Sequence, residues 1–245
     1  MKQDLFVTKI KLERDRIEDF HTYPFNIDIV KQFDEIELES PVTFFIGDNG
    51  IGKSTFIEAL AVSLGLNPEG GSQNFSFHTM NTHSNLSDYL RVSTYDRPVT
   101  KFFLRAESFY NVASEIVHIS EEGGQGPLYD TYGGNLHECS HGEAFLKLIQ
   151  NRFYDRGLYI LDEPEAALSP QSQLSLLCLI DDLVKNGSQF IIATHSPILI
   201  AYRDGKILDL NQNFQEVNYK GTNIYQLYKM FLEDHEGMQH RLLDE

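Results

Sequence analysis

The spacing of apolar and polar residues changes along the chain, and the changes predict an α/β protein. Apolar residues alternate with polar ones at 5–12, 25–29 and 36–38, which is typical of half-buried antiparallel strands. Residues 42–46 are instead continuously apolar, as in a strand covered on both faces of a parallel sheet. A helical pattern with one apolar face follows at 56–64, and Gly65 stands where that helix should end.

Strands and helices also alternate in the last third of the chain. Apolar runs at 158–161 and 190–194 flank a helical pattern at 171–186, so we expect a βαβ unit with two parallel strands. The remaining expected elements are a strand at 102–105, a helix at 140–152, strands at 206–210 and 214–219, and a helix at 223–232.

These elements predict a mixed central sheet flanked by helices, with an N-terminal antiparallel β part. No linker separates two independent units, so we expect a single domain over residues 1–245. Residues 66–100 are polar and 120–136 are rich in glycine, which predicts a variable region at about 66–139 within that domain.

The loop after the first buried strand carries a nucleotide-binding motif. It satisfies G-x-x-x-x-G-K-[ST], and it stands between a buried strand and an amphipathic helix, which is the context that this motif requires. Glycines let backbone N–H groups surround phosphate oxygens, Lys53 would neutralise the β- and γ-phosphates, and Ser54 would ligate Mg²⁺. The predicted phosphate-binding residues are Gly47, Asp48, Asn49, Gly50, Ile51, Gly52, Lys53, Ser54 and Thr55.

Two further strands of the predicted sheet end in residues suited to hydrolysis. The first ends in Asp162 and Glu163. Asp162 would face the phosphates and hold Mg²⁺ through water, and Glu163 could accept a proton from an attacking water. The βαβ unit places the second strand beside it, so that His195 would lie within reach of the γ-phosphate. A histidine at a strand end can also be purely structural.

The segment Ser140-His141-Gly142-Glu143 opens the helix that precedes the Asp-Glu strand. By itself, S-x-x-E indicates a capping box, with Ser140 as N-cap and Glu143 three residues later. The same helix start also presents backbone N–H groups and a hydroxyl to an anion.

In their order and spacing these motifs resemble the ABC-type ATPases, within them the soluble branch around the SMC and RecF repair ATPases, and most of all compact stand-alone bacterial "predicted ATPases". The resemblance spans nearly the whole chain. It implies a head-to-tail homodimer in which each ATP lies between the phosphate loop of one copy and Ser140, His141, Gly142 and Glu143 of the other. It also implies that Glu163 is the catalytic base and His195 the γ-phosphate sensor.

The chain departs from the family pattern at three places. His141 replaces the first of two adjacent glycines, and the loop 167–170 after the Asp-Glu pair lacks its usual Asp. Glu107 stands near the place of a glutamine that normally helps to hold the metal, so we include it in the expected metal site.

Composition narrows the class of function. The 36 acidic residues exceed the 20 Lys and Arg, which gives a net charge of −16 and argues against broad electrostatic binding to nucleic acid or anionic membranes. The two cysteines form no C-x-x-C pair, and no membrane span or signal peptide is evident, so we expect a cytoplasmic protein without membrane insertion.

The sequence therefore predicts a soluble ATPase that converts ATP and water to ADP and phosphate with Mg²⁺, and that acts as a switch on a protein partner. Two alternatives stay open. One is the ATP-binding subunit of a membrane transporter, and the other is an ATPase that regulates a separately encoded nuclease or toxin in defence or DNA repair. The segment between Lys53 and Ser140 is too short for the long coiled coil of SMC-type proteins.

Overall fold

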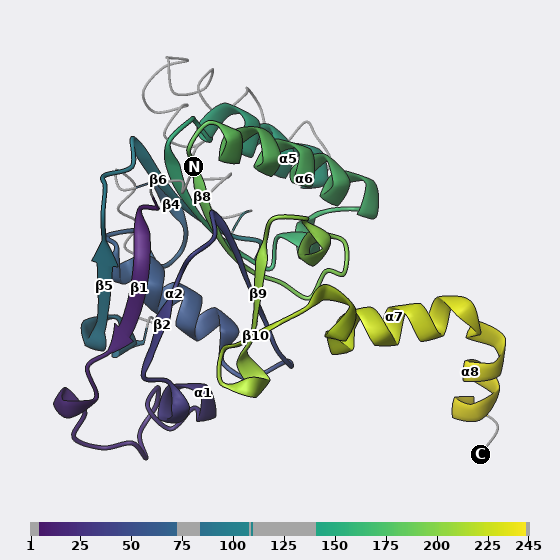
Figure 1. Cartoon of the computed structure of the whole chain (residues 1–245), viewed down its shortest axis with the longest axis horizontal. Coiled ribbons are helices and arrows are strands. Elements are labelled where there is room, and N and C mark those ends of the chain that lie inside the picture. The colour runs from purple at the N-terminus through teal and green to yellow at the C-terminus, as the bar shows by residue number, and fades with distance from the viewer. Residues whose placement is uncertain (1–4, 73–83, 108, 110–140, 244–245) are drawn as a thin grey trace.

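A seven-stranded mixed sheet, ordered β10-β9-β3-β8-β7-β6-β4, forms the centre of the protein (Figure 1). The computed structural model describes residues 5–72, 84–107, 109 and 141–243. Five neighbouring strands run parallel, while β10 and β4 are antiparallel to their neighbours. The strands of this sheet are β3 (Val42–Ile46), β4 (Gly71–Ser72), β6 (Thr100–Arg105), β7 (Gly157–Asp162), β8 (Gln189–Ala193), β9 (Lys206–Asp209) and β10 (Gln215–Val217).

A smaller antiparallel sheet, ordered β2-β1-β5, lies against the central one. Its strands are β1 (Val7–Leu12), β2 (Glu35–Glu37) and β5 (Leu90–Thr94). The buried Gln189 side chain joins the two sheets, because its amide accepts from the Val7 N–H and donates to the Val7 carbonyl, each at 2.9 Å. This pair of bonds satisfies backbone groups of β1 that would otherwise be buried without partners.

Helices cover both faces of the central sheet, because successive strand residues point to opposite sides. Phe44 contributes to the core beneath α5 (His141–Arg152) and α6 (Pro170–Lys185). Phe45 contributes to the core shared with α2 (Lys53–Ser63), α1 (Asp28–Gln32) and the small sheet. The helix after the phosphate loop and the helix that opens near Ser140 thus lie on opposite faces of the sheet (Figure 1).

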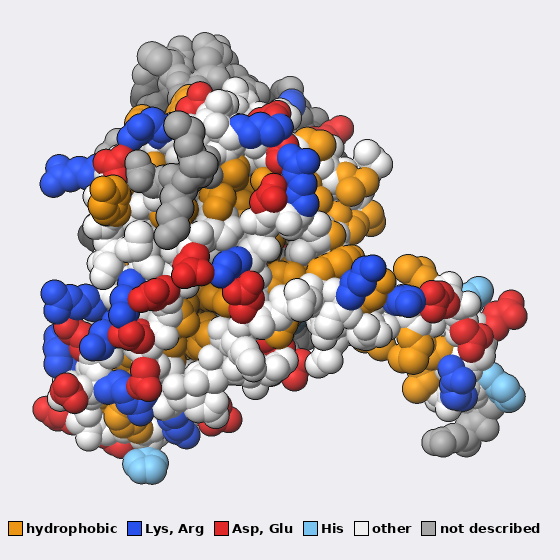
Figure 2. Space-filling view, viewed as in Figure 1, with side chains coloured by type: hydrophobic (Ala, Val, Ile, Leu, Met, Phe, Trp, Pro, Cys, Tyr) orange, Lys and Arg blue, Asp and Glu red, His pale blue; other side chains and the backbone are white. Residues whose placement is uncertain are grey.

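The two last helices, α7 (Asn223–Glu233) and α8 (His235–Leu243), project from the sheet as an arm (Figure 1). The Thr222 hydroxyl caps α7 by accepting from the Tyr225 N–H at 3.2 Å. Large apolar side chains are exposed along the arm, as Figure 2 shows, among them Leu227, Phe231 and Leu242. Within the described ranges, no helix is both long and apolar enough to span a lipid bilayer.

The predicted fold class is confirmed, but one predicted strand is wrong and two elements were not predicted. Residues 25–29 are not a strand: Phe25, Ile29 and Phe33 are buried four residues apart, which suits the turn and short helix α1. The polar region at 66–100 contains an edge strand, β5, of which only Leu90 is buried. The chain also forms α8, in which Leu242 and Leu243 are exposed and Gly237 lies in the first turn, so its sequence gives no amphipathic signal.

Candidate functional site

The carboxyl ends of neighbouring parallel strands bring the predicted site residues to one edge of the sheet. β3 is followed by the phosphate loop, β8 by Thr194 and His195, and β7 ends at Asp162. Since β8 lies between β3 and β7, these loops adjoin one another. Ligands of open α/β sheets bind at such an edge.

The phosphate loop leaves the start of α2 open to an anion. Gly52 is the N-cap residue, with a left-handed backbone (φ 108°), and a Cβ at this position would come within 2.8 Å of Ile27 Cγ2. Glycine is therefore required here both by conformation and by space. Because glycine has no side chain that could accept from the first amides of the helix, those N–H groups remain available to phosphate oxygens.

Lys53 is the buried cation of this loop. Its Nζ donates to the carbonyls of Gly47 at 2.9 Å and Asp48 at 3.0 Å. Burial lowers the pKa of the Lys53 ammonium, and the charges of Glu163 and Asp162 oppose that shift. The loop therefore holds a poorly solvated positive charge beside its own carbonyls, which suits an incoming polyphosphate.

Asp162 and Ser54 supply oxygen donors suited to Mg²⁺. The Ser54 hydroxyl donates to Asp162 Oδ1 at 3.2 Å, and the Asp162 side chain is only 3% exposed. Burial raises the pKa of the Asp162 carboxyl, and its contact with Arg105 opposes the rise. A hydroxyl next to a carboxylate matches the oxygen preference of Mg²⁺, which keeps several waters and phosphate oxygens as its other ligands. The described residues contain no cluster of three or more His, Cys, Asp or Glu that would hold a metal by itself.

Glu163 and His195 face each other across the strand ends. Glu163 has a left-handed backbone (φ 49°), and its N–H donates to the Ala193 carbonyl of β8 at 2.9 Å. Its Oε1 lies 3.6 Å from His195 Nε2. That nitrogen is shielded from solvent and has no hydrogen-bond partner among the described residues. Burial, followed by the charge of Lys53, lowers the pKa of the imidazole. A neutral His195 can thus offer Nε2 to a ligand oxygen.

Two residues that the sequence analysis missed hold this arrangement together. Glu165 accepts from the Thr194 hydroxyl at 2.7 Å and from the His195 N–H, so it fixes the backbone that carries His195. Arg105, at the end of β6, donates to Asp162 at 3.0 Å. Two signals in the sequence could have revealed them: Glu165 is the third acid of Asp162-Glu163-Pro164-Glu165, and Arg105 is a cation at the end of an apolar strand.

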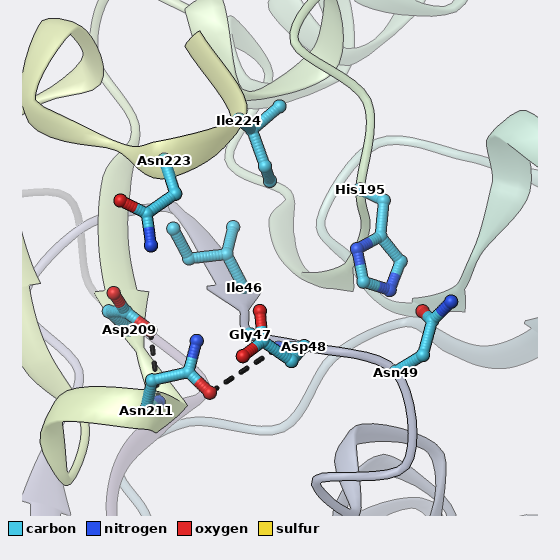
Figure 3. A pocket seen from close by; sticks show the side chains of 9 residues that line it. All are labelled: Ile46, Gly47, Asp48, Asn49, His195, Asp209, Asn211, Asn223 and Ile224. Atoms are coloured by element: carbon cyan, nitrogen blue, oxygen red, sulfur yellow. Dashed lines mark hydrogen bonds between the residues drawn. The ribbon is translucent and has the colours of Figure 1, made fainter. Parts of the chain in front are cut away.

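A polar cavity of about 210 Å³ opens beside the phosphate loop (Figure 3). The imidazole of His195 and the amide of Asn49 face this space, and the start of α7 forms its far wall. Asn211 accepts from the Asp48 N–H at 3.4 Å, which ties the loop to the segment after β9. The residues that line the cavity are Ile46, Gly47, Asp48, Asn49, His195, Asp209, Asn211, Asn223 and Ile224.

The predicted trans-acting segment is described only from its second residue onward, because Ser140 lies outside the described residues. α5 begins at His141. A Cβ on Gly142 would lie 3.2 Å from the Ala167 carbonyl, so the helix start packs against the loop after Glu163. The assignment of this segment to the ATP site of a second copy stays a prediction.

Glu107 lies two residues beyond β6, and its side chain is exposed. The strand end nearest to Asp162 is occupied by Arg105 instead, which pairs with Asp162 in the parallel register of β6 and β7. A metal role for Glu107 therefore stays a prediction that the geometry of the site does not support directly.

Two family models match parts of the chain. Residues 16–132 match the model of the AAA domain family, and residues 144–200 match that of the AAA ATPase domain family. No curated protein matches the chain in sequence.

Among solved structures, the chain is similar to MJ1267, an ATP-binding cassette of an ABC transporter in its ADP conformation. This similarity has 16% identity and a TM-score of 0.50, and it covers 92% of this chain and 98% of that one. It is also similar to cbiO1 of Clostridium perfringens, part of the ABC transporter complex cbiONQ, with 17% identity, coverage of 98% and 100%, and a TM-score of 0.46. A third similarity is to an SMC head bound to the C-terminal winged-helix domain of ScpA, with 14% identity, coverage of 83% and 94%, and a TM-score of 0.46.

Proposed function

Because this chain has the fold of an ABC-type ATPase, we propose that it binds Mg·ATP between two copies of itself, hydrolyses the ATP and uses this cycle to control a protein partner. The observation that carries the proposal is the convergence of Lys53, Asp162, Glu163 and His195 at adjoining strand ends. These four side chains have four different tasks in the proposed reaction.

Lys53 and the first amides of α2 bind the phosphates, and Ser54 with Asp162 would hold Mg²⁺. When bound, Mg²⁺ neutralises the charge that develops on the phosphoryl oxygens. Glu163 takes the proton of the attacking water, and His195 Nε2 contacts the γ-phosphate. Two observations support this division of roles: Glu163 is partly exposed, and His195 Nε2 has no hydrogen-bond partner in the part of the chain that the structure describes.

The position of α5 supports a site shared by two copies. Its start packs on the loop after Glu163 and lies across the sheet from α2, so it does not close over the phosphate loop of its own chain. In a head-to-tail pair, residues 140–143 of one copy would cover the phosphate loop of the other. The helix N-terminus would then offer its N–H groups to the γ-phosphate.

A shared site makes hydrolysis depend on protein concentration. We expect the rate of phosphate release per chain, at saturating Mg·ATP, to rise as the chain is concentrated and then to level off when most copies are paired. Reaction series over a wide range of chain concentrations would measure this. A rate per chain that stays constant throughout the range would mean that one copy hydrolyses ATP alone.

Weak binding to free duplex DNA is a further expectation. Affinity for DNA rises with the number of phosphates that a protein neutralises, and a net charge of −16 leaves few such contacts. Fluorescence anisotropy with a labelled duplex at physiological salt should show little binding. Tight, salt-sensitive binding would reveal a local basic groove and would favour a role in DNA repair.

The partner and the compartment belong to the proposal as well. We favour a cytoplasmic switch of the soluble branch over a transporter subunit. The reason is that segment 140–143 has His141 where the ABC-type ATPases have the first of two adjacent glycines. Regulation of a separately encoded nuclease or toxin is the second alternative. The product of a neighbouring gene would distinguish the three roles, since it would be a membrane permease, a repair protein or an effector.

A further inference from the structure

Arg105 joins the predicted metal site to the helix that follows the phosphate loop. Its side chain is 18% exposed and contacts two carboxylates at once. Nε donates to Asp162 Oδ2 at 3.0 Å, and Nη1 donates to Glu58 Oε2 of α2, also at 3.0 Å. The planar guanidinium suits this geometry, because it presents several donors in a fixed arrangement.

Asp162 is consequently held at both of its oxygens. Oδ1 accepts from the Ser54 hydroxyl and Oδ2 from Arg105. Burial of a carboxylate costs free energy unless hydrogen bonds and a nearby cation replace its contacts with water. The chain supplies both from its own side chains, and it does so at the residue expected to hold Mg²⁺.

We propose that Arg105 is a positioning residue that acts as the built-in counter-cation of Asp162. It fixes the position of the carboxylate, with Oδ1 turned toward the Ser54 hydroxyl, before nucleotide arrives. The guanidinium already balances the negative charges of Asp162 and Glu58, and Lys53 adds a second positive charge nearby. A divalent cation without nucleotide would therefore gain little electrostatic free energy by binding at Asp162. Mg²⁺ is therefore expected to enter together with the phosphates of ATP. This inference rests on the proposed function, which places Mg·ATP at Asp162.

Thermal unfolding without nucleotide tests the inference. In EDTA, Arg105→Gln should lower the unfolding midpoint by roughly 5–10 °C, because the buried Asp162 and the partly buried Glu58 lose their shared partner. Adding Mg²⁺ alone should raise the midpoint of Arg105→Gln, since the metal can take the place of the guanidinium. The wild-type midpoint should stay unchanged by the same addition. An equal rise in the wild type, or no rise in Arg105→Gln, would overturn the inference.

Three further variants distinguish this role from simple packing. Arg105→Gln combined with Asp162→Asn should lose the Mg²⁺ response, because the carboxylate that receives the metal is gone. Glu58→Gln, which leaves the Arg105–Asp162 contact in place, should respond like the wild type. If Arg105→Gln does not fold, Arg105→Lys should give a smaller loss and a measurable Mg²⁺ response, because one ammonium cannot bridge both carboxylates. A Mg²⁺ response that persists in the double variant would contradict the inference.

The proposed function can fail separately from this inference. Calorimetric titration of the wild type with Mg·ATP tests nucleotide binding itself. An absence of binding would remove the proposed function. Normal binding of Mg·ATP, together with a rise in the unfolding midpoint of the wild type on adding Mg²⁺ alone, would remove only the role of Arg105.

Discussion

Glu163→Gln is expected to slow ATP hydrolysis by roughly 10²- to 10⁴-fold, which is the usual contribution of a positioned general base. Glutamine keeps the shape of the side chain and its hydrogen-bonding capacity, but it cannot take a proton from water. The substitution leaves the contact of Lys53 with the Gly47 carbonyl and that of Ser54 with Asp162 in place. Steady-state phosphate release measures the loss, and calorimetry should show that Mg·ATP still binds with nearly the wild-type affinity.

The combination of lost turnover and retained binding is what identifies Glu163 as the base. Hydrolysis at the wild-type rate in Glu163→Gln would exclude that role and would direct attention to His195 or Glu165. A parallel loss of binding and turnover would indicate that Glu163, which has a left-handed backbone (φ 49°), is needed for the shape of the loop instead.

Lys53→Ala is expected to weaken ATP binding by roughly 10- to 100-fold. Hydrogen bonds to charged groups contribute about 1.5–3 kcal/mol, and each 1.4 kcal/mol is tenfold in affinity. The substitution also leaves the negative charges of Asp162 and Glu163 without the neighbouring ammonium, so they would repel the phosphates. Calorimetric titration with Mg·ATP measures the change.

Lys101→Ala provides a matched control. Lys101 is also a partly buried lysine, and its Nζ donates to a backbone carbonyl, that of Leu64, at 3.0 Å. It lies near the start of β6, at the opposite end of the strand from Arg105, so ATP affinity should be unchanged. Unchanged ATP binding in Lys53→Ala, or an equal loss in Lys101→Ala, would contradict the phosphate-loop assignment.

The sequence predicts this fold well wherever a strand is buried on both faces. Continuous apolar runs such as those of β3 and β8 have few alternative placements, and the motifs at their ends then fall at one edge of the sheet. Short or exposed elements are predicted poorly. At residues 25–33 an alternating pattern coincides with a spacing of four, so one set of apolar residues fits both a strand and a helical turn.

The residues of the site also differ in how well the sequence predicts them. Lys53, Asp162 and Glu163 belong to contiguous motifs, and so their chemistry can be predicted from the sequence alone. Arg105 and Glu165 act through contacts with residues 29 or more positions away. Such contacts follow from strand order and register, which a single sequence does not specify.

The central claim is that ATP holds two copies of this chain together, and the mass of Glu163→Gln in solution tests it most directly. Light scattering after size-exclusion chromatography should show one copy without nucleotide and two copies with saturating Mg·ATP, because a variant that cannot hydrolyse ATP retains the closed pair. Adding Ser140→Arg to Glu163→Gln should abolish the shift while ATP still binds to the single copy. A Glu163→Gln protein that binds Mg·ATP and yet keeps the mass of one copy would contradict the shared site.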